Sequence, residues 1–155
     1  GRGHRIEFFS IGISYPVAYL TSCKLQLIGL PASSRFDWHM QLIAATQLRK
    51  GDVAFGISCS GATRETVRCL EIARSKGAKT ICVTNSMKSP ITAHSDIALF
   101  ATPSEIKYFQ APLASRITQL AIVDALFVFL AQRHKDRTAV QLRNAGEELL
   151  KQRLI

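Results

Sequence analysis

Short apolar stretches that suit β-strands alternate with helix-like stretches over about the first hundred residues of this 155-residue chain. The predicted strands are residues 6–11, a short one ending at about 34, and residues 53–58, 79–84 and 97–100. Strands that are mostly apolar along their whole length are typical of a parallel sheet that helices cover on both faces. The alternation therefore predicts an α/β fold, a three-layer α/β/α sandwich around a five-stranded parallel sheet.

The helices predicted between these strands set the connections of the sheet. They are residues 15–30, a helix capped by Asp37 and ending near 48, a helix ending at Lys76 and Gly77, and then two final helices at 108–133 and 139–154. This order of elements favours the flavodoxin-like strand order 2-1-3-4-5, in a single domain that covers residues 1–155. In such a sheet, ligands bind where the loops after the first and third strands meet.

The composition excludes several classes of protein. The 20 Lys and Arg residues outnumber the 11 Asp and Glu residues, giving a net charge of +9, but they form no basic run, so we expect a solvated basic surface rather than a nucleic-acid groove. The most apolar stretch, 120–131, is too short to cross a bilayer and contains Asp124. We expect a buried helix there, with Asp124 hydrogen-bonded in the core, and no contact with a membrane.

The cysteines and histidines show no metal-binding pattern. The four cysteines form no CxxC pair, and the four histidines lie in separate segments. We therefore predict reduced thiols in the cytoplasm, no metal site and no cofactor.

The loop after the third strand carries an unusual density of hydroxyl groups, in the sequence SCSGATRET at 58–66. Ser58, Ser60 and Thr63 surround Gly61 just before a helix, whose free backbone N–H groups and partial positive charge favour an anion. The loop therefore predicts a phosphate site, to which Ser14 contributes from the facing loop after the first strand. The alternative is that the hydroxyls only cap the helix. Neither a P-loop nor a dinucleotide-binding fingerprint is present.

The stretch from 57 to 85, ISCSGATRETVRCLEIARSKGAKTICVTN, together with GIS at 12–14, resembles the SIS (sugar isomerase) domain. The segments DWHMQLIAATQLRKGDVAFGIS, SPITAHSDIAL and SRITQLAIVDALFVFLA are similar to the effector domain of RpiR-type bacterial transcriptional regulators. This resemblance implies that the chain binds a phosphorylated sugar or sugar acid, with Ser58, Ser60 and Thr63 on the phosphate, Gly61 shaping the loop and Ser14 assisting.

The resemblance also has implications beyond the ligand site. It implies an N-terminal helix-turn-helix domain, absent from this sequence, through which alone DNA would be bound. It implies a homodimer or tetramer as well, with the last two helices as plausible contact surfaces.

The role of Glu105 distinguishes two interpretations of this resemblance. Some relatives are aldose-ketose isomerases that use a glutamate near this position as a base, so Glu105 is either a ligand-facing residue or an acidic residue in the first turn of a helix. Our main prediction is a sensor without enzymatic activity. The alternatives are a sugar-phosphate isomerase that uses Glu105, and a nucleic-acid binder in its own right.

Overall fold

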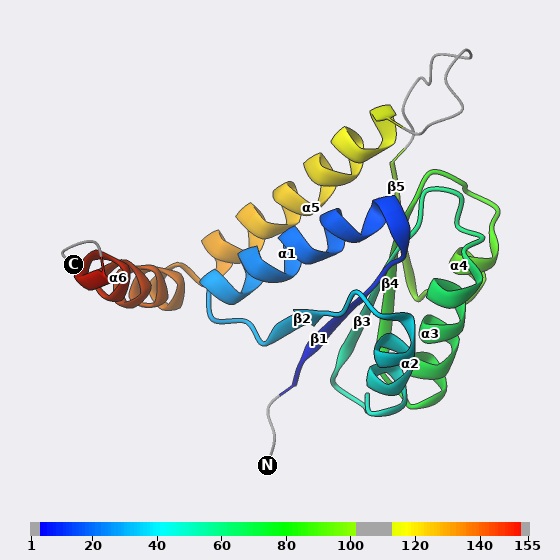
Figure 1. Cartoon of the computed structure of the whole chain (residues 1–155), viewed down its shortest axis with the longest axis horizontal. Helices are drawn as coiled ribbons and strands as arrows, with labels where there is room; N and C mark the ends of the chain where they lie inside the picture. The colour runs from blue at the N-terminus through cyan, green and yellow to red at the C-terminus, as the bar shows by residue number, and fades with distance from the viewer. Residues whose placement is uncertain (1–3, 102–112, 153–155) are drawn as a thin grey trace.

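The computed structural model describes residues 4–101 and 113–152, and within them the five strands form one parallel sheet. The strand order is β2-β1-β3-β4-β5, as the order of the sequence elements predicted (Figure 1). The strands are β1 Ile6–Phe9, β2 Ala32–Ser34, β3 Val53–Ile57, β4 Lys79–Thr84 and β5 Ile97–Phe100.

Helices cover both faces of this sheet and make the sandwich three-layered (Figure 1). One face carries α1 (Tyr15–Leu27) and α5 (Leu113–Arg133), and the other carries α2 (Trp38–Thr46), α3 (Arg64–Ser75) and the short α4 (Pro90–Ala93). A single 3₁₀ turn, η1 (Gly12–Ser14), joins β1 to α1. The last helix, α6 (Lys135–Gln152), contacts α1 and α5 and projects away from the sheet.

Two apolar cores, one on each face of the sheet, hold these layers together. Neighbouring strand residues point to opposite faces, so Phe8 packs under α1 and α5 whereas Phe9 packs under α2 and α3. Gly56 of β3 allows α3 to come close, because a Cβ atom at this position would lie 2.8 Å from Leu70 Cδ1. This close packing fixes where the N-terminus of α3 lies relative to the end of β3.

Several element boundaries differ from the prediction for local reasons. The first strand ends at Phe9 rather than residue 11, because the Ser10 N–H donates to Gln41 Oε1 (3.0 Å) and the Ser10 hydroxyl donates to the Ile57 carbonyl (2.8 Å). The predicted cap is confirmed, since Asp37 Oδ1 accepts from the Met40 N–H at 2.9 Å. The last helix begins at Lys135 rather than 139, and the part of the fifth helix predicted at 108–112 lies outside the described residues.

The prediction that Asp124 lies in the core is wrong. Its side chain is 46% exposed and pairs with Lys24 of α1, with Lys24 Nζ 2.5 Å from Asp124 Oδ1. The physical reason is that α5 buries only one side: Val123 is buried, but Val128 and Phe129 are exposed. Among the described residues, no helix is both long and apolar enough to span a membrane.

Candidate functional site

The loops that follow β1 and β3 meet at the carboxyl edge of the sheet. Because β1 and β3 are adjacent and parallel, both loops leave the same edge. Ser14, at the end of η1, is buried, and its Oγ lies 3.7 Å from Cys59 Sγ in the β3 loop. The two hydroxyl-bearing loops that the sequence singled out are therefore in contact.

Gly61 gives the β3 loop its shape. Its φ of +67° is a left-handed conformation that residues with a Cβ rarely adopt, and a Cβ here would lie 2.2 Å from Ser89 Oγ. The Gly61 N–H donates to Ser58 Oγ (3.1 Å), and its carbonyl accepts from the Ile91 N–H of α4 (2.9 Å). The loop is thus held between the end of β3 and the start of α4.

The three predicted phosphate-binding hydroxyls lie in different environments. Ser58 is buried and its Oγ lies 2.9 Å from Thr63 Oγ1, so these two hydroxyls form a pair. Ser60 is exposed, and its Oγ accepts from the Ala62 N–H at 3.2 Å. The structure therefore brings Ser58 and Thr63 together, while Ser60 stands at the rim of the loop.

The hydroxyls do not cap α3, which was the alternative explanation for their presence. Thr63 occupies the N-cap position, but no described side chain makes a capping hydrogen bond there. The first-turn N–H groups of a helix have no partner within the helix, and they carry a partial positive charge. An uncapped helix N-terminus beside two paired hydroxyls is an arrangement suited to binding an anion such as phosphate.

The backbone of Cys59 is hydrogen-bonded to residues at the end of β4. Its carbonyl accepts from the Asn85 N–H (3.0 Å) and from Thr84 Oγ1 (3.2 Å). Its Sγ is approached by Ser14 on one side and by Gln119 of α5 on the other, where Gln119 Nε2 lies 3.1 Å away. Gln119 was missed at the sequence level, where the only signal was a polar residue just before the most apolar part of the helix predicted at 108–133.

The remaining candidate groups lie either outside the described residues or away from this cluster. Glu105 lies outside the described residues. Within the ranges 4–101 and 113–152, no group of three His, Cys, Asp or Glu side chains could hold a metal ion. Burial raises the pKa of the Cys69 thiol to about 12 and also raises that of Cys82, and both thiols lie in the core between the sheet and α3.

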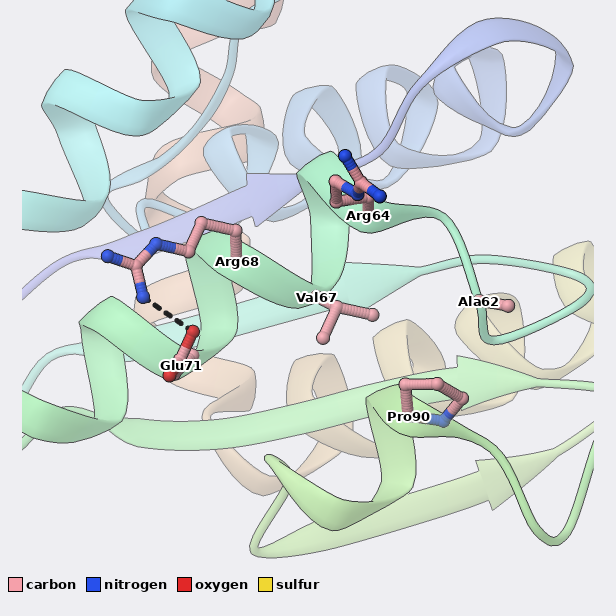
Figure 2. Close-up of a pocket in the computed structure, with 6 residues that line it drawn as sticks. All are labelled: Ala62, Arg64, Val67, Arg68, Glu71 and Pro90. Atoms are coloured by element: carbon pink, nitrogen blue, oxygen red, sulfur yellow. Dashed lines mark hydrogen bonds and ion pairs between the residues drawn. The ribbon is translucent and has the colours of Figure 1, made fainter.

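A surface hollow of about 300 Å³ lies beside the loop, on the outer side of α3 (Figure 2). It is lined by Ala62 of the loop, Pro90 of α4 and four residues of α3, among which Arg68 pairs with Glu71 at 2.6 Å. This hollow is separate from the contact between Ser14 and Cys59.

Comparisons with known proteins agree with the fold. A family model described as the SIS domain matches residues 2–129. An HTH-type transcriptional regulator of Caldanaerobacter subterraneus is 40% identical over 146 residues, which are 94% of this chain and 52% of that protein. The HTH-type transcriptional regulator RpiR of Escherichia coli K12 is 29% identical over 90% of this chain and 47% of its own length. The chain therefore spans about half the length of these curated relatives.

Two solved structures share the fold. The Vibrio vulnificus NanR protein, solved in complex with ManNAc-6P, superposes with a TM-score of 0.87 at 24% identity, over 96% of this chain and 56% of that one. The sugar isomerase domain of an RpiR transcription factor from Sphaerobacter thermophilus gives a TM-score of 0.83 at 24% identity, over 94% and 80% of the two chains. With the family model matching most of its length, this chain belongs to the SIS domain family.

Proposed function

We propose that this chain is the sugar-phosphate-binding effector domain of a helix-turn-helix transcriptional regulator of carbohydrate metabolism. The observation that carries the proposal is the pair of hydroxyls of Ser58 and Thr63 at the uncapped N-terminus of α3. The proposal is supported by relatives that are HTH-type regulators about twice as long as the part matched, and by a structural neighbour solved with ManNAc-6P. A cytoplasmic location follows from this function.

In the proposed complex, the ligand phosphate sits against the first turn of α3. The hydroxyls of Ser58, Ser60 and Thr63 donate to phosphate oxygens, and Gly61 lets the backbone approach. Ser14 contributes from the facing loop, and Glu105 is a further ligand-binding residue of this proposal. Binding then favours one of two conformations of the regulator, and this preference changes DNA binding by a domain outside this sequence.

Ligand-observed proton NMR in heavy water tests this function directly. A panel of sugar phosphates and sugar acid phosphates is mixed with the chain, and line broadening identifies those that bind. We expect Ser58→Ala and Thr63→Ala each to weaken binding by about 1–3 kcal/mol, the usual range for hydrogen bonds to a charged group. Ser75→Ala is the matched control, because Ser75 lies at the far end of α3. If both loop variants bound sugar phosphates with unchanged affinity, the phosphate would have to bind elsewhere.

The same samples separate the sensor from an isomerase. A sensor binds a sugar phosphate and leaves it unchanged, whereas an isomerase exchanges a carbon-bound proton for deuterium and interconverts aldose and ketose. We propose the sensor. Exchange that Glu105→Gln abolishes would establish the isomerase instead.

We also propose that the chain assembles as a homodimer or tetramer through its last two helices. Large apolar side chains are exposed on α5, such as Phe129, and on α6, such as Leu142 and Leu149. Exposed apolar area of this kind favours a protein contact. Light scattering should report a mass above that of one chain, reduced by Leu149→Lys but not by Glu147→Lys on the same helix. A monomeric wild-type chain would refute the assembly.

A further inference from the structure

Gln119 is a fully buried side chain in α5, and one end of its amide has no partner among the described residues. Its Nε2 lies 3.1 Å from Cys59 Sγ, while Oε1 is buried and makes no hydrogen bond within the described part of the chain. An amide end buried without a partner is costly, and the great majority of buried polar groups in proteins are paired. In this orientation the amide end that faces away from Cys59 is a hydrogen-bond acceptor.

This amide lies beside the loop that is proposed to bind the phosphate. Cys59 lies between Ser58 and Ser60 in the proposed phosphate loop, and its Sγ is also close to Ser14 Oγ, at 3.7 Å. Gln119, from α5, therefore contacts the place where the loops after β1 and β3 meet. The sulfur is a weak hydrogen-bonding partner, so it satisfies the amide poorly.

We propose that Gln119 is a ligand-binding residue whose free amide end hydrogen-bonds to the sugar part of the ligand. This inference rests on the proposed function and extends it. The partner of the amide is a hydroxyl or another group that can donate a hydrogen bond, on a carbon near the phosphorylated end. Gln119 thus recognises the polyhydroxy chain, while Ser58 and Thr63 hold the phosphate.

The experiment compares two probes on the same variants by isothermal titration calorimetry. The probes are inorganic phosphate, which occupies only the phosphate seat, and a panel of hexose 6-phosphates and pentose 5-phosphates. Gln119→Leu should weaken binding of the sugar phosphates by about tenfold or more and leave the affinity for inorganic phosphate unchanged. Gln132→Leu, an exposed position on the same helix, is the control and should change neither affinity.

The melting temperature of the ligand-free variant distinguishes a role of Gln119 in ligand binding from a role in stabilising the fold. Gln119→Leu removes a buried amide of which one end is unpaired. The melting temperature of the variant should therefore equal or exceed that of the wild type. If leucine prevents folding, Gln119→Met provides the same comparison with a flexible side chain.

Three results would overturn the inference. They are unchanged sugar-phosphate affinity in the variant, an equal loss for inorganic phosphate and sugar phosphates, and a wild-type chain that binds no member of the panel. The last of these would also refute the proposed function, whereas the first two would leave it standing.

Discussion

Replacing Gly61 by alanine should destabilise the fold through two separate effects. The left-handed conformation at φ +67° costs an alanine about 1–2 kcal/mol. The new Cβ would also lie 2.2 Å from Ser89 Oγ and 2.8 Å from Thr84 Oγ1. Ser89 must then move, and the hydrogen bond that its hydroxyl donates to the Ser86 carbonyl (3.2 Å) is lost, at about 1 kcal/mol.

These contributions sum to about 2–3 kcal/mol, which corresponds to a fall in melting temperature of about 4–12 °C for a domain of this size. Urea denaturation followed by circular dichroism measures the free energy of unfolding directly. The displaced loop should also bind inorganic phosphate more weakly, because Gly61 donates its N–H to Ser58 Oγ.

Two other glycines provide matched controls. Gly12 has φ +61°, but a Cβ atom at this position would have no neighbour within 4 Å among the described residues, so Gly12→Ala should cost only the conformational part, about 1–2 kcal/mol. Gly146 lies inside α6 with open space around it, and Gly146→Ala should stabilise the chain by up to about 1 kcal/mol. If Gly61→Ala cost no more than Gly12→Ala, the steric part of the reasoning would be refuted.

Three further predictions concern charge and burial. The Thr80 N–H, together with neighbouring cations, holds the pKa of Asp96 below its usual value, so its stabilising effect is present above the ordinary pKa and is lost as the pH falls through the lowered one. Asp96→Asn should therefore flatten the plot of unfolding free energy against pH below about pH 4. Burial raises the pKa of Cys69 to about 12, so at pH 8 this thiol should resist alkylation until the chain unfolds, and rapid labelling in the native protein would contradict its burial. Asp124→Asn should lower stability by about 1 kcal/mol or less, because the pair with Lys24 is partly exposed, and a larger loss in urea denaturation would count against this.

The helix start at Asp37 could be predicted because it depends on residues close together in the chain, and the strand order because few topologies are available. Apolar strands alternating with helices leave few ways to build a parallel sheet. A cap is a contact across three residues, here from Asp37 to Met40. The hydroxyl loop was recognised for the same reason, as a dense local motif beside a predicted helix.

The environments of Asp124 and Gln119 could not be predicted in this way. Both lie in the helix predicted at 108–133, and its periodicity does not say which side of the helix meets the sheet. The structure turns Asp124 toward Lys24 and solvent, and Gln119 toward Cys59 in the core. These pairings join residues 100 and 60 positions apart in the chain.

The sequence by itself determined the fold class, the sheet order and the hydroxyl-rich loop, because hydrophobic patterning and turn chemistry act over a few neighbouring residues and a parallel α/β sheet allows few strand orders. Only the tertiary structure decided that Thr63 pairs with Ser58 instead of capping α3, and that Gln119 contacts Cys59. Packing α3 against Gly56 and laying α5 across the sheet bring these groups together, and no local pattern encodes distances between elements far apart in the chain.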